Sequence, residues 1–201
     1  MLDQLSEKNL LDDPIDQFKI WFEDAKKYSG VEHPNSCCLS TIGTDGAPEG
    51  RVVLLKRFDE RGFVFYTNYN SRKARSLAKS PRACLSFHWD KLMRQIRVAG
   101  DVEKIPEKES EEYFAGRPRG SQLSAWASAQ SEEVDTRAEL EKRMAELDVK
   151  YAGVVPRPPY WGGYLLIPSE IEFWQSRDDR LHDRFLFRRG RSGWEPVRLC
   201  P

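Results

Sequence analysis

The apolar residues of this chain are grouped in short runs, such as VVLL, FVFY, YLLI and FLF, with turn signals between them. Short runs at spacings of roughly 8–12 residues predict a series of antiparallel strands. The βαβ alternation that a parallel sheet requires is absent. We therefore expect a mainly β fold of the α+β class, a barrel or sandwich with helices packed outside it. No run approaches the roughly 18–20 residues that span a bilayer.

Helices are expected on either side of these strands and between them. Residues 13–29 predict an amphipathic helix capped by Asp13, with Pro14 in its first turn. A second, short helix is expected in SRKARSLAKSP (71–81), with Ser71 as its N-cap and Pro81 past its end. We expect one domain, 1–201, with an N-terminal helix (about 13–29) and a helical insertion (about 106–150) that holds a charged helix over 132–150. Strands are expected over residues 37–42, 51–58, 63–68, 82–89, 92–105, 160–168, 170–175, 180–188 and 194–199.

Basic and acidic residues balance, with 32 of each, so the formal net charge is zero. No global field then draws the chain to nucleic acid or to a membrane. The basic residues form separate clusters, which favours discrete anion sites, although each cluster taken singly also fits a solvated face. The acidic N-terminus does not resemble a signal peptide, and the four cysteines form no C-x-x-C pair. We expect a cytoplasmic protein with reduced thiols and no metal, because its three histidines are isolated.

The stretch RVVLLK (51–56) places four apolar residues between two cations. A continuous apolar run predicts a strand buried on both faces. Arg51 and Lys56 are five residues apart, so an unbulged strand sends them to opposite faces, and any anions they bind belong to different groups. The alternative is that both cations simply reach water from the ends of the strand.

Residues 65–73, FYTNYNSRK, lead from a strand into the start of a helix. First-turn N–H groups, a capping hydroxyl and two adjacent cations form a good phosphate receptor. Arg72 and Lys73 lie at the positive end of the helix dipole, where cations are disfavoured without an anion. The alternative is an ordinary capped and solvated helix.

A second group of polar residues lies further along the chain. YFAGRPRGS (113–121) offers a phenol, two guanidiniums and a hydroxyl, which together can surround another phosphate. Gln95, Arg97, Gln130, Ser131, Trp174 and Gln175 supply groups of the kind that hold a planar heterocycle. Taken singly, each of these residues is more often a structural hydrogen-bonding group or a packed aromatic ring.

RLHDR (180–184) concentrates positive charge next to the apolar FLF. In a strand, Arg180, His182 and Arg184 share one face, and Asp183 points to the other. Three potential cations on one face repel one another unless an anion or solvent lies between them. No P-loop, G-x-G-x-x-G or G-x-S-x-G motif accompanies these residues.

Taken in order, these segments resemble the pyridoxamine/pyridoxine 5′-phosphate oxidase family, FMN enzymes of vitamin B6 salvage. The resemblance runs from roughly residue 37 to the end and is carried by RVVLLK, FYTNYNSRKA (65–74), RQIRV (94–98), YFAGRPRGSQLSAWASAQS (113–131), YWGGY (160–164), IEFWQ (171–175), RLHDRF (180–185) and RLCP (198–201). It implies an FMN-binding split β-barrel and a homodimer with FMN at the interface. It also implies oxidation of pyridoxamine 5′-phosphate and pyridoxine 5′-phosphate to pyridoxal 5′-phosphate, with O2 as acceptor and H2O2 released.

The resemblance also assigns residues, position by position. The positions that match FMN contacts are Arg51, Val52, Tyr66, Thr67, Arg72, Lys73, Gln95, Gln130, Ser131, Trp174 and Arg184. Those that match the substrate-phosphate site are Lys56, Tyr113, Arg117 and Ser121, while Arg180 and His182 match catalytic positions against the substrate ring. Arg184 would stabilise the reduced flavin. His182 could act as a base, but hydride transfer from C4′ does not require a strong one, which favours positioning.

The sequence departs from the family pattern at its ends. The family often carries a basic, Tyr-containing N-terminal arm, whereas the first 13 residues here are acidic and Leu-rich, so no role is transferred to them. Cys200 replaces the usual alanine before the final proline. Two rival functions remain: an enzyme of the same fold with another flavin-type cofactor or substrate, and a non-catalytic carrier or sensor of flavin or pyridoxal phosphate.

Overall fold

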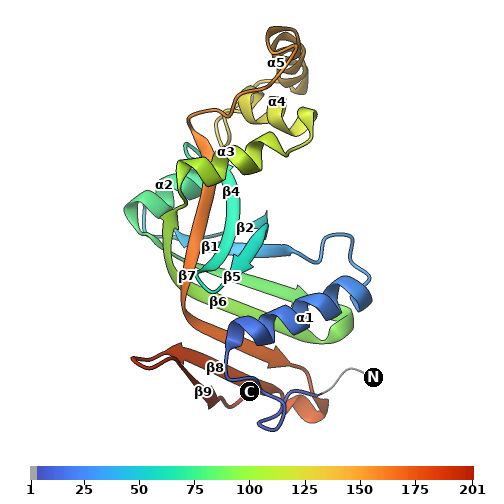
Figure 1. The fold of residues 1–201 in the computed structure, drawn as a ribbon, viewed down its shortest axis with the longest axis vertical. Coiled ribbons are helices and arrows are strands. Elements are labelled where there is room, and N and C mark those ends of the chain that lie inside the picture. The colour runs from blue at the N-terminus through green and yellow to red at the C-terminus, as the bar shows by residue number, and fades with distance from the viewer. Residues whose placement is uncertain (1–3) are drawn as a thin grey trace.

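A computed structural model of the chain describes residues 4–201 and contains a nine-stranded antiparallel sheet (Figure 1). The main path of the sheet has the order β2-β1-β5-β6-β7-β4-β3, and β8 and β9 continue from β7. The strands are β1 (Ser36–Ile42), β2 (Pro48–Leu54), β3 (Arg57–Asp59), β4 (Gly62–Asn68), β5 (Arg82–Trp89), β6 (Arg94–Lys104), β7 (Trp161–Gln175), β8 (Asp183–Arg189) and β9 (Trp194–Arg198). The helices are α1 (Pro14–Tyr28), α2 (Arg72–Lys79), α3 (Glu107–Ala115), α4 (Arg119–Ala127) and α5 (Arg137–Lys150).

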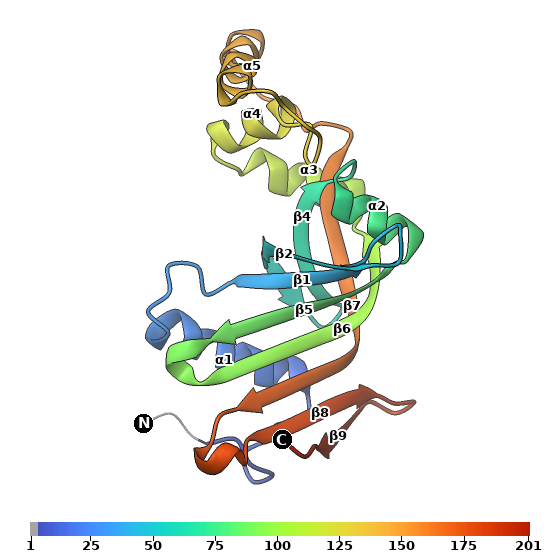
Figure 2. The same ribbon diagram turned by 180° about the vertical axis from the view of Figure 1, so that it is seen from behind.

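The long strand β7 curls the sheet. β6 runs along one edge of β7, while the other edge pairs with β4 over its first half and with β8 over its second. The β6–β7 register shifts between Ala99 and Gly100. A Cβ on Gly100 would lie 1.9 Å from the carbonyl oxygen of Ile167, so the bulge needs glycine there. The result is a half-barrel with flanking helices (Figure 2), which confirms the mainly β fold.

Helix α1 packs against the core of the half-barrel. Asp13 caps it, accepting a hydrogen bond from the Ile15 N–H, as the sequence predicts. Phe18 is fully buried, and its ring meets those of Phe58, Phe63 and Phe87 edge-on. Edge-to-face aromatic contacts add to the free energy gained from burial. None of the helices in the described part of the chain is long and apolar enough to cross a membrane.

Helices α3, α4 and α5 lie at one end of the sheet, and the β8–β9 hairpin lies at the other, in both views (Figures 1 and 2). A smaller core containing Phe114, Leu123 and Trp161 joins this helical segment to the sheet. The charged helix begins at Arg137, later than the predicted 132. Thr136 sets this start, because its extended backbone and its hydroxyl, which accepts from the Glu139 N–H, form the N-cap.

The expected strand 51–58 is broken, and it is not buried on both faces. β2 ends at Leu54, Leu55 and Lys56 lie outside any strand, and β3 begins at Arg57. β2 is at the end of the sheet, so its outer edge and one of its faces stay open, and Val52 is 70% exposed. An apolar run alone cannot distinguish a central strand from an edge strand.

Candidate active site

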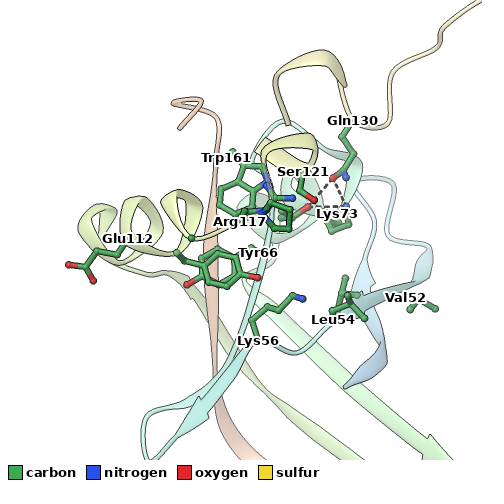
Figure 3. A pocket seen from close by; sticks show the side chains of 15 residues that line it. Val52, Leu54, Lys56, Tyr66, Lys73, Glu112, Arg117, Ser121, Gln130 and Trp161 are labelled. Atoms are coloured by element: carbon green, nitrogen blue, oxygen red, sulfur yellow. Dashed lines mark hydrogen bonds between the residues drawn. The ribbon is translucent and has the colours of Figure 1, made fainter. Parts of the chain in front are cut away.

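A cavity of about 770 Å³ lies where β2 and β4 meet helices α3 and α4 (Figure 3). Figure 3 shows side chains from both the sheet and the helical segment around it, with Glu112 pointing away. The residues that line it and were expected at the site are Val52, Lys56, Tyr66, Thr67, Lys73, Tyr113, Arg117, Ser121 and Gln130. Segments far apart in the sequence therefore form a single cavity.

One wall of this cavity is a stack of aromatic rings. The rings of Tyr66 and Tyr113 are 3.8 Å apart and nearly parallel, and Trp161 continues the stack at 5.4 Å from Tyr66. Burial raises the pKa of Tyr66 to about 12 and also raises the pKa of Tyr113. Both phenols are therefore protonated at neutral pH and can donate hydrogen bonds.

Arg117 brings a partly desolvated cation to the same wall. Its guanidinium carbon lies 4.5 Å from the centre of the Trp161 ring. Burial lowers the pKa of Arg117, which the neighbouring Tyr113 partly offsets, and its buried Nη1 has no hydrogen-bond partner among residues 4–201. A buried donor without a partner costs free energy unless a ligand accepts from it. Arg117 is thus prepared for an anion.

Lys73 forms the opposite, polar corner. Its Nζ donates to Oε1 of Gln130 at 2.8 Å and to Oγ1 of Thr67 at 3.2 Å. Burial, followed by repulsion from Arg51, lowers the pKa of Lys73 to about 8. An anion bound beside this ammonium would favour its charged form.

A second cavity of about 430 Å³ adjoins the first and shares Lys73 with it. Arg51, Arg72 and Ser131, three expected phosphate or cofactor contacts, line it together with Glu49 and Gly50. Arg51 and Lys56 therefore line different cavities. The hydroxyl of Ser131 accepts from the Arg72 N–H at 3.1 Å, and Ser131 adopts a left-handed φ of 75°. Ser71 precedes α2 as predicted but makes no side-chain capping bond.

The other expected site residues form a separate group on the sheet. Gln95 on β6 is opposite Trp174 on β7, and Trp174 is opposite Arg184 on β8, so the three form a row across the strands. The ring of His182 is 4.7 Å from the ring of Trp174. None of these residues, nor Arg180, lines either of the two cavities in its own chain.

The predicted alternation of RLHDR is wrong, because β8 begins only at Asp183. Asp179 and Arg180 adopt left-handed φ values of 55° and 60° within a short 3-10 turn, so Arg180 and His182 do not share a strand face with Arg184. His182 is held instead by the Arg177 N–H, which donates to its Nδ1 at 3.1 Å.

Ion pairs neutralise much of the positive charge around this turn. Asp183 accepts from Arg177 and from Arg198, the latter at 2.7 Å, so Asp183 does pair with neighbouring cations. Arg184 donates to Glu172 at 2.8 Å and to the carbonyl of Cys200. The N-terminal segment joins the network, since Glu7 pairs with Arg198.

Sequence reasoning missed three residues of these sites. Trp161 lies within a motif that carries the family resemblance, but its aromatic neighbours come from other elements and give no local signal. Arg177 holds His182 through its main-chain N–H, which no side-chain pattern reveals. Glu49 was detectable, because it precedes Arg51 by two positions and shares its strand face.

Two models of known protein families match the segments that contain the site residues described above. A family model described as pyridoxamine 5′-phosphate oxidase matches residues 24–151. A second, described as the pyridoxine 5′-phosphate oxidase C-terminal dimerisation region, matches residues 161–201. The cavities lie mainly within the first match, and β7 to β9 lie within the second.

Curated proteins named pyridoxine/pyridoxamine 5′-phosphate oxidase are similar along nearly their full length. The protein of Rubrobacter xylanophilus is 54% identical over 198 residues, covering 98% of this chain and 91% of its own. The protein of Cupriavidus taiwanensis is 52% identical over 202 residues, covering 100% of this chain and 95% of its own.

Two solved structures share the fold. PhzG from Burkholderia lata 383, solved in complex with tetrahydrophenazine-1-carboxylic acid, is 32% identical with a TM-score of 0.91, covering 100% of this chain and 99% of its own. A pyridoxamine 5′-phosphate oxidase-related, FMN binding protein from Nostoc punctiforme is 17% identical with a TM-score of 0.74, covering 96% and 99%. The expected split β-barrel is thereby confirmed.

Proposed function

The chain belongs to the pyridoxamine 5′-phosphate oxidase family, and on that premise we propose that it oxidises pyridoxamine 5′-phosphate and pyridoxine 5′-phosphate to pyridoxal 5′-phosphate. FMN is the proposed cofactor, and O2 is the proposed electron acceptor, which is reduced to H2O2. The observation that carries the proposal is the pair of adjoining cavities, each with its own cations. Two phosphorylated molecules, a cofactor and a substrate, need two such anion sites side by side.

The smaller cavity fits the phosphate of FMN. Arg51, Arg72 and Lys73 supply charge, and the hydroxyl of Ser131 supplies a further donor. Arg72 and Lys73 open helix α2, where first-turn N–H groups also favour an anion. Lys73 continues into the larger cavity, where Thr67 and Gln130 offer polar contacts for a flavin ring.

The larger cavity fits the substrate phosphate. Lys56 and Arg117 provide two cations, and Tyr113 and Ser121 provide neutral donors. The buried Nη1 of Arg117 has no partner in the described part of the chain, and an incoming phosphate oxygen would satisfy it. The stacked rings of Tyr66, Tyr113 and Trp161 exclude water from one side of the cavity.

Catalysis depends mainly on positioning. Arg51, Arg72, Lys73 and Ser131 would hold FMN, which would supply the hydride acceptor for oxidation at C4′ of the substrate, with O2 as the final electron acceptor. The chain contributes two phosphate sites that fix the distance and angle between the reacting molecules, and such orientation can supply several kcal/mol of a reaction barrier. The protonated phenols in the cavity act as hydrogen-bond donors rather than as bases.

We propose that a homodimer completes the site. Gln95, Trp174, Arg184, Arg180 and His182 line neither cavity in their own chain, and all but Gln95 belong to the match with the dimerisation region. The same residues of a second copy would then close the cavities of the first, with FMN at the interface. The exposure of Val52 on the edge strand β2, beside the larger cavity, supports this arrangement.

His182 acts in this proposal as a donor that positions the substrate. Its Nδ1 accepts from the Arg177 N–H, so the proton of the neutral ring is on Nε2. A neutral imidazole held this way presents an N–H rather than a lone pair to a molecule on the Nε2 side. This supports positioning over proton abstraction.

The proposal is tested with the purified protein. Flavin absorbance is recorded first, and aldehyde and peroxide are then followed with pyridoxine 5′-phosphate in air. The proposal predicts a yellow protein and equal amounts of both products. Bound flavin without turnover would favour a carrier, and a protein that cannot be reconstituted with FMN would contradict the proposal altogether.

A further inference from the structure

The smaller cavity contains an acidic side chain among its cations. Glu49 on β2 has a side chain only 9% exposed. One carboxylate oxygen accepts from Nε of Arg72, and the other accepts from Nη2 of Arg51 at 2.8 Å and from Oγ of Ser76 at 3.0 Å. The two arginines are the same residues that the proposed function assigns to the phosphate of FMN.

The fold itself brings this carboxylate to the cations. Glu49 and Arg51 are two residues apart on β2, so their side chains share one face. Arg72 and Ser76 are four apart on α2 and share one side of that helix. Burial raises the pKa of Glu49, but the hydrogen bonds from Arg72 and Ser76 and the charges of Arg72 and Arg51 together outweigh it, so the net shift is downward and Glu49 is an anion at neutral pH.

Arg51 does not depend on the Glu49 carboxylate for its position. Its Nη1 also donates to the carbonyl of Leu39 at 3.1 Å and to Oγ1 of Thr41 at 2.7 Å, as well as to the main-chain carbonyl of Glu49. These bonds involve no carboxylate and would survive its neutralisation. Arg72, by contrast, is 66% exposed and can turn toward another anion.

We propose that Glu49 is an internal counter-anion that competes with the phosphate of FMN for Arg51 and Arg72, and so sets the affinity of the chain for its cofactor. The inference rests on the proposed function, because it takes FMN as the ligand. A carboxylate and a phosphate beside the same two guanidiniums repel each other, so FMN binds only after the Arg72–Glu49 contact weakens or at the cost of that repulsion. Removing the charge while keeping the shape should tighten binding.

The test compares the flavin-free wild-type chain with Glu49→Gln. FMN and riboflavin, which lacks the phosphate, are titrated by quenching of flavin fluorescence. The dissociation constant of FMN should fall by about tenfold or more in Glu49→Gln, as expected for removal of one nearby like charge, while that of riboflavin stays unchanged. Glu109→Gln is the matched control, because Glu109 also bridges two arginines, Arg57 and Arg61, outside the smaller cavity. It should leave the FMN constant unchanged.

Thermal melts keep the test informative if Glu49→Gln folds less well. Without ligand, the variant should melt at a lower temperature than wild type, because Arg51 and Arg72 lose their counter-anion. Inorganic phosphate should nevertheless raise the melting temperature of the variant by more than it raises that of wild type. Unchanged or weaker FMN binding by Glu49→Gln, or equal tightening for riboflavin, would overturn the inference while leaving the proposed function intact. Failure of the wild-type chain itself to bind FMN would count instead against the proposed function.

Discussion

Nζ of Lys73 donates to Oε1 of Gln130 at 2.8 Å, which ties the start of helix α2 to the segment that follows helix α4. Lys73 lines both cavities. Its ammonium is therefore the point where the proposed cofactor phosphate and the rest of the flavin site meet.

Replacing Lys73 should weaken FMN binding. Lys73→Met removes a charge-assisted contact and should raise the dissociation constant of FMN by about tenfold to a hundredfold, measured by flavin fluorescence. Lys79→Met is the control, because Lys79 lies on the same helix but donates only to the exposed carbonyl of Thr44. Equal losses in both variants would show that the effect comes from the helix rather than from the site.

FMN affinity should also depend on pH through Lys73. Burial lowers the pKa of Lys73 to about 8, so the ammonium in the flavin-free chain loses its proton as the pH rises through that value. The dissociation constant of FMN should therefore increase above about pH 8, and the increase should flatten in Lys73→Arg, whose guanidinium stays charged. A titration from pH 6.5 to 9.5 checks this at roughly half-unit steps. An identical pH profile in Lys73→Arg would rule out Lys73 as the titrating group.

Two arginines should separate cofactor binding from substrate use. Arg72→Ala should weaken FMN, since Arg72 lines the smaller cavity. Arg180→Ala should impair turnover of pyridoxine 5′-phosphate while FMN stays bound, since Arg180 ends the 3-10 turn that leads to His182. Flavin content and steady-state kinetics measure the two effects separately. Similar losses of FMN from both changes would contradict this division.

The ion pair between Glu7 and Arg198 should stabilise the fold at neutral pH and lose that effect in acid. The hydrogen bond from Arg198 lowers the pKa of Glu7 to about 2, so the pair stabilises the fold above the unfolded-state pKa of about 4.5 and is lost as the pH falls toward 2. The melting temperature of wild type should exceed that of Glu7→Gln at pH 6, and the difference should close between pH 4.5 and 2. A difference that persists at pH 2 would mean that Glu7 acts by packing rather than by charge.

The core should depend strongly on Phe18. Phe18→Ala removes a fully buried ring that contacts three others and should lower the free energy of unfolding by about 3–5 kcal/mol, measured by urea denaturation. Ile20→Ala on the same helix removes a side chain that is half exposed and should change the free energy of unfolding by only about 0.5 kcal/mol.

Local patterns predicted most of the elements but not how they meet. The strand 82–89 and helix α1 follow from alternation, capping and apolar spacing, which are properties of neighbouring residues. The break at Leu55 and Lys56 and the exposure of Val52 depend on the position of β2 at the end of the sheet, which only the whole fold decides. Strand alternation failed at Arg180, because two left-handed residues replace the strand there.

Local sequence patterns likewise do not show how the residues of the site come together. Residue types alone suggested two anion sites, and the structure places Arg51 and Lys56 in separate cavities. The sequence could not show which site residues line the cavities and which form the row across β6, β7 and β8, because that depends on which strands pair. The role of Glu49 depends on Arg72 and Ser76, which reach it from helix α2, 23 and 27 residues further along the chain.

If two copies of the chain build each active site, complementation between subunits will restore activity to two inactive variants. Arg117→Ala damages the cavity, and Arg180→Ala damages the turn that leads to His182, so each homodimer should be inactive. Mixed dimers, co-expressed with two different tags and purified through both, contain one cavity and one turn that are intact and face each other across the interface. The activity of the mixed dimers should return to about half of wild type, because one of the two sites is whole. Mixed dimers as inactive as the parent variants would contradict a shared site and confine it to a single chain.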